Sequence, residues 1–313
     1  MKFRIGTRKS LLAKVQSNWV KQKLEEQGLS CTLVEVDSQG DKNLTAPLYE
    51  IDAATPGLFT KQLEVALEED KIDLAVHSLK DLPIVQPSHL KLAAISERVG
   101  DGDCLVIRKK VANDAYPLEL PPGSKIGTSS LRREAQLFSI REDVRAVPVR
   151  GNVPTRTEHV RSGKLDAVIL AAAGLSRLNL SFDEVEIKIL PLDESEFVPA
   201  PGQGALGIET RANIPVELVK ALKAIHHPKT ATEVTVEREI LKGLHGGCTL
   251  PLGVKCRADG NSLKLKAFLG IFRIAADGGR QWSSFPTFDI AGSDPKVLVS
   301  RTVAYFEEER KKR

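Results

Sequence analysis

Two pairs of short segments resemble each other along the chain, and this repetition limits the fold more than any other sequence feature. Lys125-Ile126-Gly127-Thr128 echoes Arg4-Ile5-Gly6-Thr7, and each segment precedes a polar turn that opens a helical pattern. Farther along, Lys164-Leu165-Asp166 echoes Lys71-Ile72-Asp73, and an apolar run follows both. Strands that alternate with helices in this way are typical of α/β sheets. We therefore predict two similar mixed-sheet α/β domains that face each other across a cleft, with their strand-to-helix turns directed into it.

The rest of the chain divides where composition and periodicity change. Residues 37–57 accumulate Gly, Asp, Asn and Pro without periodicity, which predicts a lid in the first domain. The Pro- and Gly-rich stretch 199–204 predicts a hinge or a crossover, after which residues 205–208 are predicted to return to the first sheet as a strand. The last part predicts a small α+β domain with helices at 216–225 and 231–244, strands near 263–272 and 281–285, and a helix near 296–310. The predicted domains are 1–98 with 204–218, 99–203, and 219–313.

Length, cysteine usage and charge exclude several classes of protein. The 313 residues fit two or three domains, and four cysteines without a C-x-x-C pair cannot staple a chain this long. We expect a reducing, cytoplasmic compartment, because no apolar stretch of a secretory signal follows the first residues. No apolar run approaches the roughly 18 residues of a membrane helix, so we expect no membrane partner. The net charge of +4 does not indicate a nucleic-acid binder, so the positions of the arginines matter more than their number.

Arginines and small hydroxyl residues gather at the turns that follow predicted strands. The turn 127–133 places hydroxyl and guanidinium groups at a helix start, where they and the backbone N–H groups can bind anions. Its polar residues are Thr128, Ser129, Ser130, Arg132 and Arg133. The other turns carry Arg8 with Ser10, Arg150, Arg156 and Arg177. Any one of these arginines alone is more simply a solvated surface residue. Together, at corresponding turns, they predict a site for a polyanionic ligand.

His77-Ser78-Leu79-Lys80-Asp81 forms a second candidate site, at the end of a predicted buried strand. Among arginines, Asp81 would stay ionised, so that it could accept hydrogen bonds from N–H groups and stabilise positive charge that develops nearby. A turn aspartate beside a solvated Lys80 is an equally good interpretation of the spacing alone. His77 has no partner at metal-ligand spacing, so we interpret it as structural and predict no metal site.

Cys248 is the one cysteine with the features of a covalent attachment point. It follows Gly246-Gly247 in a turn after a predicted helix, whereas Cys31 and Cys104 lie in predicted apolar strands and Cys256 lies in a strand-like run. A buried, inert cysteine is the usual case. The turn makes Cys248 the candidate nucleophile, because an accessible thiolate reacts and a buried thiol does not.

Five motifs, in this order, resemble those of the porphobilinogen deaminases, also called hydroxymethylbilane synthases. The motifs are Val76-His77-Ser78-Leu79-Lys80-Asp81-Leu82-Pro83, Gly127-Thr128-Ser129-Ser130-Leu131-Arg132-Arg133, Arg150-Gly151-Asn152-Val153, Pro201-Gly202-Gln203-Gly204-Ala205 and Gly246-Gly247-Cys248. Each motif alone is weak, but five in the right order are highly specific. The resemblance runs from Arg4 to about Gly253, and the residues after it are compatible but generic.

The resemblance implies a transferase of tetrapyrrole (haem) biosynthesis that joins four porphobilinogen molecules into linear hydroxymethylbilane and releases ammonia. A dipyrromethane cofactor would hang by a thioether from Cys248, and the free carbon of its terminal ring would attack the electrophile formed from each substrate. Asp81 and Lys80 would be catalytic, with Asp81 holding pyrrole N–H groups and assisting proton transfer. The acetate and propionate groups of the pyrroles would need the carboxylate donors that the arginines supply. The family also implies a cytoplasmic monomer whose paired domains are of periplasmic-binding-protein type.

The resemblance further divides the site residues by role. The cofactor-binding set is Cys248, Asp81, Ser78, Thr128, Ser129, Ser130, Arg132, Arg133 and Lys80. The substrate-binding set is Arg8, Ser10, Gln16, Phe59, Arg150, Arg156, Arg177 and Gln203. Two departures concern the lid, because Pro56 stands where family members often carry lysine, and Asp52 where a basic residue is common. The lid therefore supplies less positive charge here, and Lys61 is a candidate substitute.

Two other classes of function stay open on the residues alone. A cleft-type binding protein for a small anion, without catalysis, fits the paired α/β domains, although such proteins are normally secreted. A nucleic-acid-binding module fits the arginines, but few aromatic residues interleave with them and no familiar module appears. The mass of the intact protein separates all three classes, because only the enzyme carries a covalent two-pyrrole adduct.

Overall fold

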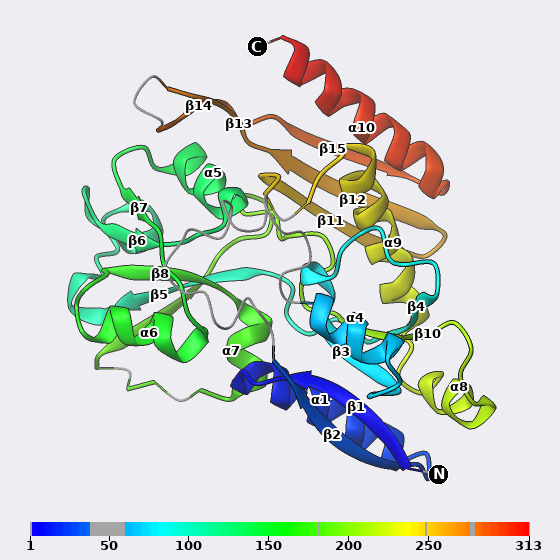
Figure 1. The fold of residues 1–313 in the computed structure, drawn as a ribbon. Helices are drawn as coiled ribbons and strands as arrows, with labels where there is room; N and C mark the ends of the chain where they lie inside the picture. Colours follow the sequence, from blue (N-terminus) through cyan, green and yellow to red (C-terminus); the bar gives the residue numbers. More distant parts are fainter. Residues whose placement is uncertain are drawn as a thin grey trace.

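A computed structural model of the chain describes residues 2–37, 60–180, 182–183, 185–247, 249–275 and 279–312 (Figure 1). Nearly all of the predicted lid, with Asp52 and Pro56, lies outside these residues, and so do Phe59 and Cys248. Two five-stranded sheets and a smaller third unit make up the described part. Among the described residues, no helix is long and apolar enough to cross a membrane.

The first sheet mixes parallel and antiparallel strands. Its order is β2 (Ser30–Val36), β1 (Lys2–Arg8), β3 (Leu74–Ser78), β10 (Leu206–Arg211) and β4 (Leu90–Ile95). β1 pairs in parallel with β2 and β3, whereas β10 runs antiparallel to both β3 and β4. The predicted return of the chain to this sheet after the crossover is confirmed, because β10 lies between two strands from the first hundred residues.

The second sheet repeats this arrangement strand for strand. Its order is β7 (Arg145–Val147), β6 (Lys125–Gly127), β8 (Ala167–Ala171), β5 (Asp103–Arg108) and β9 (Ile187–Pro191). Here too the first three strands are parallel and the fourth runs antiparallel to both of its neighbours. The predicted pair of similar mixed α/β sheets is confirmed.

The two sequence echoes mark equivalent positions in the two sheets. Asp73 accepts a hydrogen bond from Arg4 N (2.7 Å), and Asp166 accepts the equivalent one from Lys125 N (2.9 Å). Gly6 and Gly127 also share one packing constraint. A Cβ at Gly6 would lie 2.3 Å from Ile72, and a Cβ at Gly127 would lie 2.6 Å from Leu165. A side chain at either glycine would therefore clash with the apolar residue of the second echo, so each echo records how its strands pack together.

Most helices begin at a polar cap. The helices joined to the two sheets are α1 (Leu11–Glu25), α4 (Lys61–Glu68), α5 (Leu131–Ile140), α6 (Val153–Arg161), α7 (Ala172–Leu178) and α8 (Val216–Leu222). The side chains of Ser10, Ser130 and Asn152 each accept a hydrogen bond from a backbone N–H in the first turn of α1, α5 and α6. Short 3₁₀ turns lie at Leu79–Asp81 (η1), Lys109–Val111 (η2) and Pro117–Glu119 (η3).

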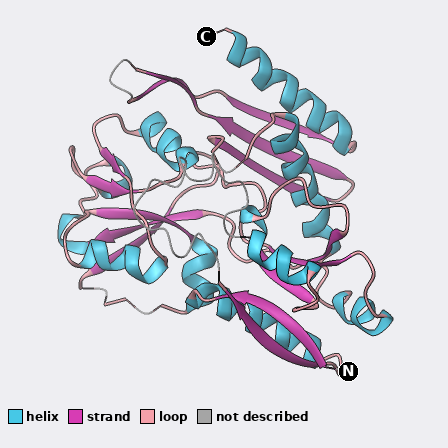
Figure 2. Cartoon of the chain, viewed as in Figure 1, coloured by secondary structure: helices cyan, strands magenta, loops and turns pink. Residues whose placement is uncertain are grey.

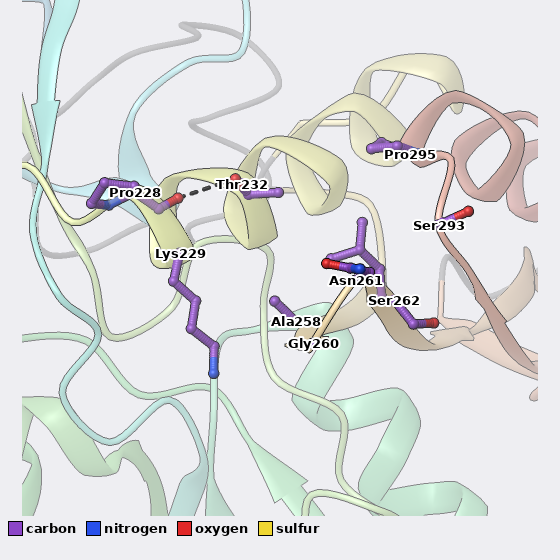
Figure 3. Close-up of a pocket in the computed structure, with 10 residues that line it drawn as sticks. Pro228, Lys229, Thr232, Ala258, Gly260, Asn261, Ser262, Ser293 and Pro295 are labelled. Atoms are coloured by element: carbon purple, nitrogen blue, oxygen red, sulfur yellow. Dashed lines mark hydrogen bonds between the residues drawn. The ribbon is translucent and has the colours of Figure 1, made fainter.

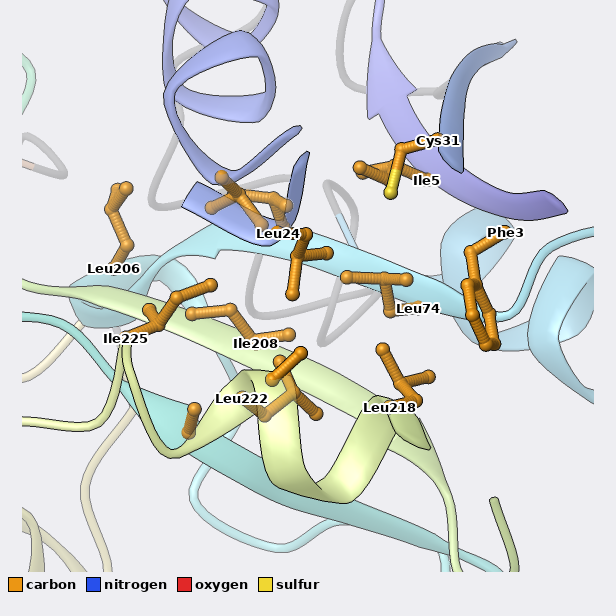
Figure 4. Close-up of a cluster of buried hydrophobic side chains, with 14 residues drawn as sticks. Phe3, Ile5, Leu24, Cys31, Leu74, Leu206, Ile208, Leu218, Leu222 and Ile225 are labelled. Atoms are coloured by element: carbon orange, nitrogen blue, oxygen red, sulfur yellow. The ribbon is translucent and has the colours of Figure 1, made fainter. Parts of the chain in front are cut away.

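The core of the first sheet includes the helix that follows β10. Leu218 and Leu222 of α8 pack with Ile225 against residues of the sheet and of α1, as Figure 4 shows. The partners drawn with them include Phe3, Ile5, Leu24, Leu74, Leu206 and Ile208. The boundary predicted between positions 218 and 219 falls inside α8. The apolar contacts of α8 therefore group the whole helix with the first sheet.

The third unit is an antiparallel sheet covered by two helices (Figure 2). Its strands are β11 (Leu252–Asp259), β12 (Ser262–Leu269) and β15 (Thr287–Gly292), and its helices are α9 (Pro228–Gly243) and α10 (Pro295–Lys311). A separate hairpin joins β13 (Ile271–Ile274) to β14 (Arg280–Ser284). The single strand predicted at 263–272 is wrong, because Gly270 separates β12 from β13 and the two strands belong to different sheets. β11 contains the strand-like run that was predicted around Cys256, whereas β15 had no predicted counterpart.

Candidate active site

The candidate site lies where the two sheets present the C-terminal ends of their parallel strands. In the first sheet, β1 ends at Arg8, and β3 ends at Ser78 directly before η1. In the second sheet, the turns after β6, β7 and β8 lead into α5, α6 and α7. α1 and α7 contact each other, so these ends of the two sheets are neighbours (Figure 1). The fold thus brings the predicted basic turns to one region.

η1 carries Lys80 and Asp81 on a single 3₁₀ turn whose apolar residues are buried. Leu79 is fully buried and Leu82 nearly so, whereas Lys80 and Asp81 are half-buried. Asp81 lies within electrostatic reach of Lys80 and of Arg156, which comes from α6 on the second sheet. One short turn therefore directs a cation and an anion toward the arginines of the other sheet.

Lys80 reaches the second sheet through a buried amide. Its Nζ donates to Oε1 of Gln203 (3.1 Å), and Nε2 of Gln203 donates to Oδ1 of Asp103 (3.1 Å). Burial, with the nearby charge of Arg133, lowers the pKa of Lys80 to about 8. Gln203, predicted to bind substrate, is fully buried and also donates to the Asp101 carbonyl (2.7 Å). Its side chain therefore joins the crossover to both sheets.

Arg132 and Arg133 of α5 share one buried carboxylate, that of Asp103. Arg132 donates to Oδ2 (2.7 Å), and Arg133 donates to Oδ1 from Nη2 (2.6 Å) and from Nε (3.2 Å). All three side chains are at least nine-tenths buried. Burial alone would raise the pKa of Asp103, but the two arginines hold it well below its usual range. Sequence reasoning missed Asp103, although an acidic residue that opens the apolar run 104–107 was the available signal.

The hydroxyl groups of the turn 128–130 hydrogen-bond to the backbone around them. Ser129 Oγ donates to the Val149 carbonyl (2.7 Å) and accepts from the Val149 N–H (2.9 Å). Thr128 Oγ1 accepts from Ser130 N (3.2 Å), and Ser130 caps α5. Thr128 N donates to Val147 O (2.9 Å), so this N–H is not one of the free donors that the turn was predicted to offer. These bonds fix the start of α5, and with it Arg132 and Arg133.

Arg150, Arg156 and Arg177 are half-buried cations on three different segments of the second sheet. Burial, with the charges of Arg133 and Arg150, lowers the pKa of Arg156 to about 10. Burial alone lowers the pKa of Arg177 to about 10, and burial also lowers the pKa of Arg150. Arg156 donates to Gly151 O (2.9 Å) and Arg177 to Gly204 O (2.6 Å), which leaves further guanidinium N–H groups available. A bound carboxylate would stabilise all three charges.

The first sheet contributes a polar edge beside η1. Gln16 of α1 is buried and donates to the hydroxyl of Ser78 (2.9 Å), which joins the helix to the end of β3. Ser10 caps α1 by accepting from Ala13 N (3.3 Å), and Arg8 stands half-buried at the end of β1. The predicted residues of this sheet thus lie along α1, β1 and β3.

The described cysteines are buried free thiols, as predicted for all three. They are Cys31, Cys104 and Cys256. Burial raises the pKa of both Cys104 and Cys256 to about 12, so neither is a thiolate at neutral pH. His77 is buried against Glu209 and is structural, as predicted. In the described part of the chain, no three His, Cys, Asp or Glu side chains group in a way that could hold a metal ion.

A surface pocket lies apart from these residues, in the third unit (Figure 3). It has a volume of about 480 Å³ and is lined by residues at the starts of α9 and α10 and by the β11–β12 turn. Thr232 and Asn261 are among them, and Thr232 bonds the Pro228 carbonyl of its own helix (3.1 Å). None of the predicted site residues lines this pocket.

The two equivalent sheets and the buried charges between them define a class of protein: two-lobed α/β proteins with a cationic site at the junction of the lobes. Residues 3–216 match the family model described as porphobilinogen deaminase, dipyromethane cofactor binding domain, and residues 231–273 match the C-terminal domain of the same family. The chain belongs to the porphobilinogen deaminase family.

Curated relatives agree with the family models over most of the chain. A porphobilinogen deaminase of Geotalea daltonii is 45% identical over 85% of this chain and 81% of its own length. The same enzyme of Geobacter sulfurreducens is 43% identical over 89% of this chain and 83% of its own, and that of Synechococcus is 47% identical over 84% and 81%. The function is that of a hydroxymethylbilane synthase, which condenses porphobilinogen in tetrapyrrole synthesis.

Solved structures of similar shape are much more distant in sequence. The VFT2 periplasmic domain of Bordetella pertussis BvgS is 17% identical, with a TM-score of 0.43 over 75% of this chain and 93% of its own. The methionine-binding protein MetQ is 12% identical, with a TM-score of 0.43 over 76% and 94%. These scores add nothing about ligand or activity. The paired sheets themselves confirm the predicted architecture of two similar mixed α/β domains with a small third unit.

Proposed function

We propose that porphobilinogen is condensed at the junction where η1 of the first sheet meets the arginines of the second, and that the chain acts there as a transferase. The observation that carries this proposal is the approach of Asp81 and Lys80 to Arg133 and Arg156 across the two sheets. A growing pyrrole chain gains two carboxylates with each unit, and such a ligand needs cations on several sides. A plain anion-binding protein would not need the Asp81 carboxylate among those cations.

The side chains at this junction fit the dipyrromethane group that the family model names. Its four carboxylates suit Arg132, Arg133 and the desolvated guanidinium groups around them, and its two pyrrole N–H groups suit one carboxylate, Asp81. When bound, the dipyrromethane supplies the nucleophilic carbon to which the first substrate unit is joined. We assign Ser78, Lys80 and the hydroxyl turn 128–130 to the same set.

Asp81 has the chemistry required at the reacting centre. An ionised carboxylate beside a substrate pyrrole stabilises the positive charge that develops as ammonia leaves, and it can accept a pyrrole N–H throughout. Lys80 can hold a proton near that carboxylate, because its lowered pKa keeps proton exchange within reach of neutral pH. Arg8, Ser10, Gln16, Phe59, Arg150, Arg156, Arg177 and Gln203 remain our assignment for the substrate and the growing chain.

We assign covalent attachment to Cys248. The raised pKa values of Cys104 and Cys256 support this choice, because their thiols stay protonated at neutral pH. The free state of the three described thiols fits a reducing, cytoplasmic compartment. We also propose that the chain acts as a monomer. For the domains we retain 1–98 with 204–218, 99–203 and 219–313, and the packing of α8 favours extending the first of them to Ile225.

The experiment is to combine intact mass, peptide mapping and product assay. The purified chain should carry a two-pyrrole adduct on Cys248 and convert porphobilinogen to hydroxymethylbilane with release of ammonia. Cys248→Ser should lose both the adduct and the activity, because a hydroxyl is a far weaker nucleophile than a thiolate. Cys256→Ala is the matched control and should keep both. An adduct mapped to Cys31, Cys104 or Cys256 would overturn the assignment, and turnover without any adduct would overturn the mechanism.

A further inference from the structure

The turn that carries Lys80 and Asp81 is tied at both ends to one buried carboxylate. Glu209, fully buried on β10, lies with Oε2 3.0 Å from Nε2 of His77, and its Oε1 accepts from Nε2 of Gln86 (2.6 Å). His77 precedes η1 and Gln86 follows it by five residues. The segment between them is therefore a closed loop whose two ends are fixed to the sheet.

A single guanidinium from the third unit holds the middle of this loop. Arg238 of α9 donates from Nη1 to the Leu79 carbonyl (3.3 Å) and to the Leu82 carbonyl (3.0 Å), and from Nη2 to the Pro83 carbonyl (2.8 Å). The three carbonyls flank Lys80 and Asp81 on both sides. Inside the turn the Leu79 carbonyl already accepts from Leu82 N (3.2 Å), and Arg238 adds a second donor to it while also binding the two carbonyls that follow the turn. Only arginine offers several donors in one rigid plane.

Apolar side chains also pack this face of α9 against the turn that carries Lys80 and Asp81. Val234 of α9 is fully buried in a cluster with Leu79, Leu82 and Ala205. Val234 and Arg238 are four residues apart, so both lie on one side of α9. The turn thus rests on α9 through two side chains, one apolar and one hydrogen-bonding.

α9 also leads to the proposed point of cofactor attachment. The helix ends at Gly243, and Cys248 follows five residues later. Arg238 therefore connects the turn that bears Asp81 to the helix that precedes Cys248. Arg238 is thus a direct polar link between the first sheet and the third unit at this turn, in addition to the crossover.

We propose that Arg238 is a positioning residue for the condensation reaction: by holding the carbonyls of residues 79, 82 and 83 against α9, it fixes Asp81 and Lys80 relative to that helix, which precedes Cys248 in the sequence. The inference rests on the proposed function of that site. Arg238 acts through the backbone of the turn and needs no contact with substrate. Because a misplacement of about 1 Å can cost roughly 10²-fold in rate, loss of the link should lower kcat rather than substrate affinity.

The test compares three variants of the full chain with the wild type. For Arg238→Ala we expect kcat to fall roughly 10- to 100-fold, KM for porphobilinogen to change less than about threefold, and the mass adduct to remain. Added guanidinium ion, far below denaturing concentration, should restore part of kcat by occupying the vacated space. Arg238→Lys, which keeps the charge but has one donor centre, should lose less activity than Arg238→Ala and covers the case in which the alanine variant fails to fold.

Arg310→Ala is the matched control. Arg310, on α10 of the same unit, also donates to a backbone carbonyl, that of Leu244 (3.4 Å), but not to the turn 79–83. A similar loss of kcat in Arg310→Ala would overturn the inference, since general loosening of the third unit would then explain it. Loss of the adduct, a rise in KM at unchanged kcat, or full activity in Arg238→Ala would overturn it too. A wild type without turnover would instead overturn the proposed function, and this inference with it.

Discussion

Arg133 holds Oδ1 of Asp103 with two N–H groups of its guanidinium, at 2.6 Å and 3.2 Å. Arg132 donates to the other oxygen of Asp103, Oδ2, so one buried carboxylate lies between two buried guanidinium groups. Two guanidinium groups on one carboxylate leave this cluster with one net positive charge. A ligand carboxylate can supply the balance, which explains how a buried pair of arginines can be both structural and ready for an anion.

Asp103→Asn should destabilise the chain strongly, because it leaves two buried guanidinium groups without their carboxylate. We expect a loss of roughly 3–5 kcal/mol, the usual cost of breaking a buried ion pair on one side. The lowered pKa of Asp103 fixes the pH dependence. Its stabilisation is present above the unfolded value of about 3.9 and is lost as pH falls through the folded value. Urea unfolding should therefore show a difference in the free energy of unfolding between the wild type and Asp103→Asn at neutral pH, and this difference should shrink in acid. A difference that does not change with pH would contradict the role assigned to Asp103.

Loss of the Lys80 proton should make kcat/KM fall on the alkaline side of its pH profile. Its pKa of about 8 means that the cation predominates near pH 7 and is largely lost near pH 9. We expect kcat/KM of the wild type to fall above pH 8, and the lower activity of Lys80→Gln to show no such fall. Because the unfolded pKa is higher, about 10.4, burial of Lys80 opposes folding at neutral pH, and this opposition disappears as pH rises from about 8 to 10.4.

Lys255 provides a control for that alkaline fall in kcat/KM. Burial lowers its pKa to about 8 as well, but it lies on β11 of the third unit, where it pairs with Asp101 and Glu194. Lys255→Gln should therefore keep the alkaline fall of the wild type. If Lys80→Gln kept the alkaline fall in kcat/KM and Lys255→Gln lost it, the titrating group would be Lys255 and not Lys80.

The repeated sheet was the most predictable part of the fold, for a physical reason. Ile72 and Leu165 leave no room for a side chain at Gly6 and Gly127. Asp73 and Asp166 accept hydrogen bonds from the neighbouring strands. Each of these contacts requires a particular residue type, so each is visible in the sequence. The antiparallel strands β4 and β9 were not predicted, because their partners are distant in sequence and their apolar runs are short. The join between β12 and β13 was missed because continuous apolar sequence conceals a change of sheet.

The candidate site was predictable as a set of turns but not as a network. Placement of Lys80, Asp81, Arg132 and Arg133 follows from the rule that ligands meet the C-terminal ends of parallel strands. The roles of Asp103 and Arg238 depend on contacts made across 29 and 156 positions of the chain, which no local pattern records. Gln203 is a similar case, because its motif marked it for substrate while its side chain joins buried groups of both sheets.

Asp81→Asn should abolish most activity and leave the fold intact. The amide keeps the size of the side chain and one acceptor, but it removes the charge that stabilises a pyrrole cation. We expect kcat to fall roughly 10²–10³-fold, as after loss of one preorganised electrostatic group. Asp81 is half-buried and is not the carboxylate that pairs with Arg132 and Arg133, so thermal unfolding should shift little. Retention of more than about a tenth of wild-type kcat would make Asp81 a turn residue only.

Arg132 and Arg177 should fail at different stages of the reaction. Arg132 is nearly fully buried beside Asp103, whereas Arg177 is half-buried on α7 and desolvated by burial alone. We expect Arg132→His to prevent stable attachment of the dipyrromethane, seen as loss of the mass adduct. Arg177→Gln should keep the adduct and stall elongation, so that chains with extra pyrroles accumulate after brief exposure to substrate. The reason is that a lost arginine–carboxylate pair costs most at the step in which that carboxylate enters a desolvated site.

Arg141→His is the control that distinguishes loss of a ligand-binding arginine from loss of any buried arginine. It directly follows α5, is as buried as Arg132, and bonds Asp143 and the Leu120 carbonyl away from η1. Arg141→His should lower the melting temperature and yet keep both the adduct and elongation, because its guanidinium meets no ligand. Mass analysis of the three variants, each incubated briefly with porphobilinogen, shows which species accumulate. Identical adduct patterns in Arg132→His and Arg177→Gln would contradict the division of labour even with the family assignment intact, since both arginines would then act at one step.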